Sequence, residues 1–144
     1  MKCLFNFFLI VLFIFPAISF PQVAKVSIIK TSNGFQLTKN GEPYYIKGAG
    51  AKSNFKKVVE SGGNSIRIWS TNKSELLDSA YKYNLSVCLG IWVSQERNGF
   101  NYNDEYNVRS QIELIKKEIL RLKDHPSVIL WGIGNEVDLQ YSNF

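Results

Sequence analysis

Residues 128–136, with the sequence VILWGIGNE, join an apolar run directly to an asparagine and a glutamate. Such a run predicts a β-strand buried on both faces, as the strands of parallel sheets are. Two earlier segments share this character, the β-rich residues 64–70 and the almost continuously apolar residues 85–93. The sequence therefore predicts several strands of a parallel sheet.

Helical patterns separate these strands. Helices are predicted over residues 53–61, 72–84 and 107–124, and the last has the clearest pattern. Its apolar face is expected to contain Ile112, Ile115, Ile119 and Leu122. Strands that alternate with helices imply an α/β fold with a parallel sheet and right-handed crossovers.

A (β/α)8 barrel and a doubly wound sheet both fit this alternation. Residues 48–51, GAGA, follow a predicted strand but lack the third glycine of a dinucleotide-binding loop. No acidic residue follows at the expected distance either. This absence favours the barrel.

A β-hairpin is predicted before the barrel strands. Residues 23–30 alternate loosely, as a strand does, and Asn40-Gly41 lies between two β-prone runs. Asn-Gly is the strongest short signal for a hairpin turn, because both residues tolerate positive φ. We expect the second arm of this hairpin to run into Gly48.

The first 19 residues have the features of a signal peptide. Lys2 precedes an apolar run, Pro16 breaks it, and Ala17 and Ser19 have the spacing that signal peptidase accepts. The sequence thus predicts cleavage before Phe20 and export to the periplasm or the extracellular space. The alternative, an uncleaved membrane anchor, is disfavoured because a spanning helix needs about 20 apolar residues.

Charge and ligand-forming residues exclude several functions. The net charge is +5, but the basic residues are spread along the chain, so we predict no nucleic-acid partner. Cys88 is the only cysteine left after cleavage and is expected to be a buried thiol. With a single histidine, His125, and no ligand cluster, the sequence predicts no metal site and no cofactor.

Asn135 and Glu136 are the strongest candidates for chemistry. They follow a predicted strand, and active sites of barrels lie at the carboxyl ends of the strands. A carboxylate beside apolar walls such as Trp131 would be poorly solvated, and desolvation raises its pKa, as a general acid requires. Asn135 has an amide that can donate to a sugar hydroxyl. The alternative is an incidental glutamate in a loop or at a helix start.

Three segments resemble one family in the same order along the chain. Residues 41–48, GEPYYIKG, resemble the segment that leads into its first barrel strand, and residues 63–67, GNSIR, resemble its second strand. Residues 125–136, HPSVILWGIGNE, resemble its fourth strand. Together they are similar to the (β/α)8-barrel domain of glycoside hydrolase family 2, which belongs to a clan of retaining glycosidases with an Asn-Glu acid/base motif.

The resemblance implies roles for five residues. Glu136 would be the catalytic acid/base, and Asn135 would bind the substrate 2-hydroxyl. Arg67 would lie on the active-site floor and favour the ionised nucleophile. Trp69 and Trp92, near strand ends, are candidates for stacking on sugar rings, with core packing as the alternative.

Arg67 is also expected on the inner face because of its neighbours. Ile66 and Ile68 flank it in the predicted strand, so its side chain should point opposite to both. The alternative is a surface arginine at a strand end.

The length of the sequence departs from the family. A complete barrel has about 250 residues, whereas residues 20–144 predict only its N-terminal half, truncated after the fourth strand. The family's nucleophile belongs to the seventh strand, and neither Glu96 nor Asp138 matches its position. The sequence therefore predicts a fragment of a retaining glycosidase acting on a carbohydrate. A non-catalytic carbohydrate-binding protein and an inactive remnant are the alternatives.

The predicted half-barrel would have two open sheet edges. Such edges pair with other strands. We therefore expect either a complementary half-barrel as a partner or self-association.

Overall fold

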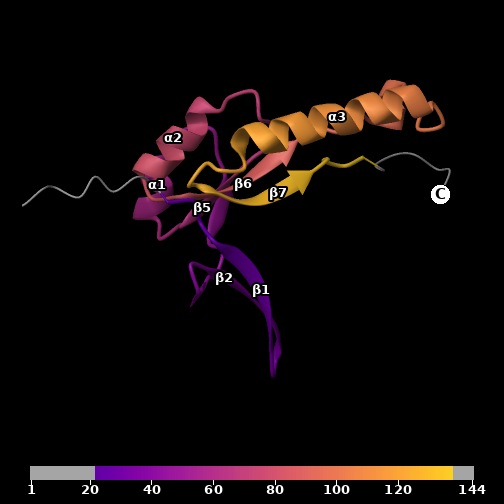
Figure 1. Cartoon of the computed structure of the whole chain (residues 1–144). Coiled ribbons are helices and arrows are strands. Elements are labelled where there is room, and N and C mark those ends of the chain that lie inside the picture. Colours follow the sequence, from indigo (N-terminus) through magenta and orange to yellow (C-terminus); the bar gives the residue numbers. More distant parts are fainter. Residues whose placement is uncertain (1–21, 138–144) are drawn as a thin grey trace, which may run out of the picture.

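A computed structural model of the protein describes residues 22–137 (Figure 1). The predicted signal peptide, residues 1–19, and Asp138 lie outside this range. The described residues form one antiparallel and one parallel sheet, with helices on the parallel sheet. None of the helices in this range is long and apolar enough to span a membrane.

The antiparallel sheet has three strands in the order β1-β2-β3. Its strands are β1 (Val26–Thr31), β2 (Gly34–Lys39) and β3 (Glu42–Pro43). Asn40 and Gly41 have φ of 55° and 90° and form the expected turn between β2 and β3. The structure adds a pairing that was not predicted, because β2 also pairs with β1 through a turn at residues 32–33. The dipeptide Asn33-Gly34 carries a signal for that turn.

The side chain of Asn64 binds the backbone of the segment that leaves the antiparallel sheet. Its Nδ2 donates to the carbonyl of Tyr45 at 2.8 Å, and its Oδ1 accepts from the amide of Lys47 at 2.8 Å. These bonds take the place of hydrogen bonds between neighbouring strands in the segment after β3. The predicted second arm of the hairpin therefore does not run to Gly48 as one strand.

The parallel sheet contains four strands in the order β4-β5-β6-β7. Its strands are β4 (Gly48–Gly50), β5 (Ser65–Ile68), β6 (Ser86–Ile91) and β7 (Val128–Ile133). The helices are α1 (Phe55–Glu60), α2 (Glu75–Lys82), the short 3-10 helix η1 (Glu96–Asn98) and α3 (Glu105–Leu122). The elements β5, β6, β7, α1 and α3 lie within two residues of the segments that the sequence predicted, whereas α2 begins three residues later than expected and η1 was not predicted.

The three α-helices share one hydrophobic core on one face of the parallel sheet. Phe55 of α1, Leu77 of α2 and Leu122 of α3 belong to the same cluster as Ile66 and Val87, which are neighbours in the sheet. A doubly wound sheet has helices on both faces, whereas a barrel has them only outside. The described chain therefore has the one-sided arrangement of a barrel wall (Figure 1).

The antiparallel sheet contacts the amino ends of the parallel strands. Lys39 Nζ donates to Ser86 Oγ at 2.9 Å, and the Tyr44 hydroxyl donates to the Asn64 carbonyl at 3.0 Å. Burial of Lys39 lowers the pKa of its amine, because desolvation disfavours the charged form. These contacts close the amino-terminal end of the sheet and leave its carboxyl end to the loops.

Helix α3 is less buried than its sequence pattern predicts. Its first turn is capped by Asp104, whose side chain accepts from the amides of Tyr106 and Asn107. Only Leu122 of the helix is buried, however, and Ile112 is 44% exposed. Figure 1 shows α3 continuing past the end of the strands, so the sheet covers only part of the expected apolar face.

The close approach of β6 to Trp69 explains Gly90 and gives a first prediction. A Cβ added at Gly90 would lie 2.7 Å from backbone atoms of Trp69. We expect Gly90→Ala to lower the free energy of unfolding by about 1–3 kcal/mol, the usual effect of overpacking. Chemical denaturation with urea measures this loss.

Gly132 is the matched control for this substitution. It lies beside Gly90 on β7, and its added Cβ would meet its nearest neighbour, Cys88 Sγ, at 3.8 Å. Gly132→Ala should therefore leave stability nearly unchanged. Equal losses in both variants would show that the Trp69 contact does not limit β6.

Candidate active site

The segment that contains Asn135 and Glu136 turns sharply after β7. The amide of Gly134 still donates to the carbonyl of Ile91 at 2.9 Å, continuing the pairing of β7 with β6. Gly134 and Glu136 then adopt φ of 78° and 49°. A left-handed conformation costs about 1–2 kcal/mol for a residue with a side chain. Glu136 is thus held in a strained backbone conformation at the carboxyl end of the sheet.

Arg67 and Asn135 meet at this end of the sheet. Arg67 is exposed on β5 between the buried residues Ile66 and Ile68, so its side chain lies on the face away from the helices. Its Nη2 donates to Asn135 Oδ1 at 3.2 Å. Because Oδ1 accepts this bond, Asn135 is left with its Nδ2 to donate to a ligand.

Trp69 joins the same cluster. Its indole ring lies over Gly50 of β4, where a Cβ would collide with the ring. The guanidinium carbon of Arg67 lies 5.4 Å from the ring centroid, a cation–π distance. With 38% of its surface exposed, Trp69 offers an aromatic face beside Arg67 and Asn135.

The inner face below this cluster is hollow. A cavity of about 410 Å³ is lined by residues of all four parallel strands, including Gly50, Arg67, Cys88 and Leu130. Arg67 and Cys88 are register partners, as are Cys88 and Leu130. Cys88 is only half-buried, contrary to the expected buried thiol, because its side chain faces this cavity and not the helices.

Trp92 lies apart from the cluster. It is 58% exposed and lines a separate cleft of about 440 Å³, between the β5–α2 loop and α3. Arg67, Trp69 and Asn135 do not line that cleft. The chain leaves β6 at Ile91, so strand alternation no longer fixes the direction of Trp92. The structure therefore does not bring Trp92 into the predicted site.

Glu136 lacks the apolar wall that the sequence predicted. Trp131 is the register partner of Leu89 and packs against the core beneath the helices. The side chain of Glu136 is exposed. The expected desolvation by Trp131 is therefore wrong, because that tryptophan lies on the opposite face of the sheet from the site.

The loop after β6 supplies contacts that the sequence did not reveal. Gln95, only 2% exposed, donates from Nε2 to the carbonyl of Asn135 at 2.8 Å and to that of Glu136 at 3.4 Å. Arg97 Nη1 donates to the carbonyl of Glu136 at 2.8 Å. Nothing in the sequence of residues 94–100 distinguishes the buried glutamine from its less buried neighbours.

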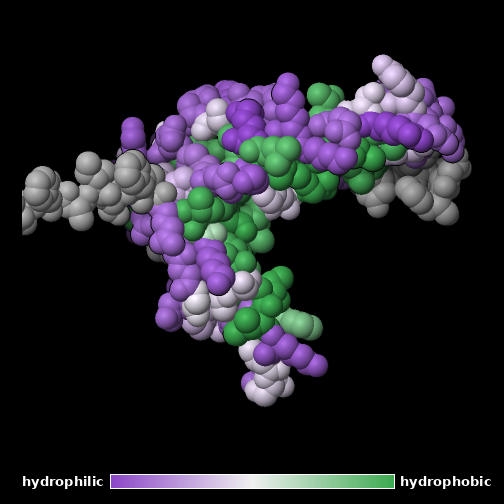
Figure 2. Space-filling view, viewed as in Figure 1, coloured by the Kyte–Doolittle hydropathy of each residue, from purple (hydrophilic) through white to green (hydrophobic). Residues whose placement is uncertain are grey.

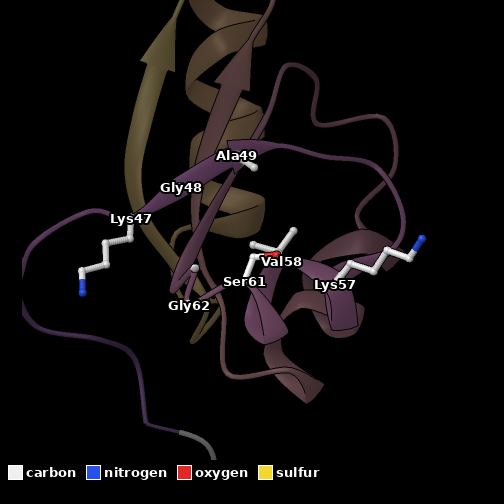
Figure 3. A pocket seen from close by; sticks show the side chains of 8 residues that line it. Lys47, Gly48, Ala49, Lys57, Val58, Ser61 and Gly62 are labelled. Carbon is white, nitrogen blue, oxygen red and sulfur yellow. The ribbon is translucent and has the colours of Figure 1, made fainter.

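Another hollow lies away from this site. It measures about 510 Å³ and lies between β4 and the end of α1 (Figure 3). Figure 3 shows Lys47 and Lys57 directed away from each other, while Val58 and Ser61 lie near its centre. Its polar side chains do not converge, so we assign no chemistry to it. Within residues 22–137, no group of three His, Cys, Asp or Glu residues could hold a metal ion.

Comparison with known families gives the class of protein. Residues 65–143, more than half of the chain, match the family described as glycosyl hydrolases family 2, TIM barrel domain. The chain belongs to this family. A search of curated proteins found no match. The family assignment agrees with the one-sided sheet and with a site at the carboxyl ends of its strands.

The contact between Arg67 and Asn135 gives a second prediction. Arg67→Met removes the donor but keeps the length of the side chain, so the Asn135 amide should lose its fixed orientation. We expect the side-chain amide resonances of Asn135 to shift in a ¹⁵N–¹H spectrum, with little change in melting temperature, because Arg67 is exposed.

Arg109→Met provides the control. Arg109 is an exposed residue of α3 whose partner is Glu105, and its loss should leave the Asn135 resonances in place. Unchanged Asn135 resonances in Arg67→Met would mean that the contact does not order Asn135 in solution.

Proposed function

We propose that the protein is a retaining glycoside hydrolase in which Glu136 is the catalytic acid/base. The observation that supports this most directly is the position of Asn135 and Glu136. In a family 2 barrel domain, they follow β7 at the carboxyl end of the sheet, where the side chain of Asn135 is held by Arg67. The substrate would be a carbohydrate with an O-glycosidic bond.

The proposed reaction has two steps. In the first, Glu136 protonates the glycosidic oxygen while a second carboxylate attacks the anomeric carbon, which forms a glycosyl-enzyme and releases the alcohol. In the second, Glu136 removes a proton from water, which attacks the same carbon and frees the sugar. The attacking carboxylate must lie about 5–5.5 Å from the first in retaining enzymes. We infer that it comes from chain outside residues 22–137.

Asn135 and Arg67 have supporting roles in this proposal. The Nδ2 group of Asn135 would donate to the hydroxyl next to the anomeric carbon, a contact that strengthens in the transition state. The fixed charge of Arg67 would favour the ionised form of the attacking carboxylate. Trp69, beside both, would offer its exposed face to a sugar ring.

We also propose that further strands cover the open parallel sheet. Within the described chain, β4 and β7 each pair on one side only, and Ile133 at the end of β7 is 52% exposed. Figure 2 shows apolar side chains gathered along the concave side between the two sheets. A complementary half-barrel would bury this surface and would also enclose Glu136, which supplies the desolvation that a general acid needs. Without such a cover, self-association through the edges would take its place.

A non-catalytic carbohydrate-binding protein is the second candidate. The exposure of Glu136 favours it, because an exposed carboxylate lacks the surroundings of a general acid. The Trp69 face and the Asn135 amide would still bind a sugar. A single substitution at Glu136 separates the two functions.

The third prediction concerns Glu136→Gln in the protein at its native length. The amide cannot donate a proton as an acid does, so hydrolysis of glycosides with poor leaving groups should fall about 10²–10⁴-fold. Glycosides with strongly acidic leaving groups need no protonation, so their kcat/KM, which reports the first step, should fall far less, although their kcat falls because the second step lacks its base. Sugar binding, measured by calorimetry, should persist.

Glu113→Gln on α3 is the matched control and should keep full activity, because Glu113 is exposed and pairs only with Lys116 among the described residues. Proton NMR of the first product should show the anomer of the substrate. An inverted product would refute the retaining mechanism. Sugar binding without hydrolysis by the unaltered protein would favour the second candidate.

The fourth prediction tests the open edge. If β7 pairs with another chain when no complementary half is present, the 144-residue chain should sediment as a dimer or larger species. Ile133→Lys places a charge on that edge and should restore the monomer. Ile112→Lys, on the exposed part of α3, is the control. A monomer only in the latter variant would mean that the helix, and not the edge, mediates association.

A further inference from the structure

We propose that Gln95, oriented by Asn98, is a positioning residue that fixes the direction of Glu136. This inference rests on the proposed function, since it concerns the acid/base of that reaction. Gln95 belongs to the loop between β6 and α3, whereas Glu136 follows β7. The proposal therefore assigns a role to a loop that contributes no group to the chemistry itself.

The contacts of Gln95 converge on the backbone of the acid/base segment. Its Nε2 bonds to the carbonyls of Asn135 and Glu136, and Arg97 bonds to the second of these from the same loop. Gln95 is 2% exposed, so water does not compete for these bonds. Two successive carbonyls are thus fixed on either side of the Glu136 Cα, whose left-handed φ directs the side chain.

Asn98 decides which end of the Gln95 amide faces those carbonyls. Asn98 Nδ2 donates to Gln95 Oε1 at 2.9 Å, which leaves Nε2 for the carbonyls. A reversed amide would set its oxygen against the two carbonyl oxygens and repel them. The backbone of Gln95 is itself anchored, because its carbonyl accepts from the amides of Asn98 and Phe100.

This arrangement matters for proton transfer. A general acid must lie within about 2.6–3.2 Å of the atom that it protonates. A small displacement of a reacting group can cost about 10²-fold in rate. Loss of the orientation should therefore slow the first step for substrates whose leaving group needs protonation, and spare that step for substrates whose leaving group does not.

The test compares Asn98→Asp with Asn98→Ala in the protein at its native length. Asn98 is exposed, so both variants should fold. The side chain of aspartate accepts hydrogen bonds but does not donate them, so it should reverse the Gln95 amide. Alanine removes the donor without supplying an acceptor, so it favours neither orientation of the amide. If Asn98 acts only by filling space, the isosteric aspartate should be the milder change. We expect the opposite order, with kcat on poor leaving groups falling about 10–100-fold in Asn98→Asp and less in Asn98→Ala.

Asn103→Asp, an exposed site in the same connection, controls for added charge. Measurement at high ionic strength separates the two effects further, since salt screens exposed charges but does not turn an amide. The loss in Asn98→Asp should persist in salt.

An NMR measurement that does not depend on enzymatic activity completes the test. Positive φ brings an amide proton close to its own Hα, which gives Glu136 a strong intraresidue nuclear Overhauser effect. This signal should weaken in Asn98→Asp and remain in Asn103→Asp. If it weakens while no variant hydrolyses any glycoside, the contact stands and the proposed function fails. If it is unchanged, or if alanine is harsher than aspartate, the positioning role is refuted.

Discussion

Parallel pairing of β5, β6 and β7 is the interaction on which the candidate site depends. Parallel strands end at the same edge of a sheet, so segments far apart in sequence arrive together. Arg67 comes from β5, Gln95 from the loop after β6, and Asn135 from the turn after β7. Arg67 and Gln95 each donate a hydrogen bond to Asn135. A shift of one residue in β5 would move Arg67 to the helix side and bury its charge. The register therefore positions the site as well as the core.

The alternating strands and helices could be predicted because buried positions give a recognisable pattern of apolar residues in the sequence. Residues 128–134 are apolar throughout and residues 85–93 almost so, and such runs follow from burial on both faces of a strand. Arg67 could be placed on the inner face for the same reason, since its neighbours are isoleucines. Helix α3 shows the limit of this reasoning: its periodic apolar face exists, but the described residues leave much of that face uncovered. Periodicity indicates a surface suited to burial, and it does not say what covers that surface.

The details of the site were harder to predict because they depend on single contacts. The sequence predicts that Trp131 packs beside Glu136, yet the register of Trp131 with Leu89 directs its side chain to the core. Trp92 lies one residue beyond β6, where alternation ceases to hold. Gln95 is buried through contacts with a segment 40 residues away, which leave no local pattern. Asn135 and Glu136 could be predicted because the Asn-Glu motif directly follows an apolar strand, and a motif can be recognised without knowing which residues are in contact.

The left-handed backbone of Glu136 also bears on how such a protein would evolve. Glycine adopts this conformation without strain, and a single nucleotide change converts a glutamate codon to a glycine codon. Selection for stability alone would therefore favour glycine at this position, since functional sites often sacrifice stability. A lineage that no longer needed the carboxylate would have an easy route to a more stable chain. The residue at position 136 is accordingly a sensitive marker of whether such a lineage still uses its active site.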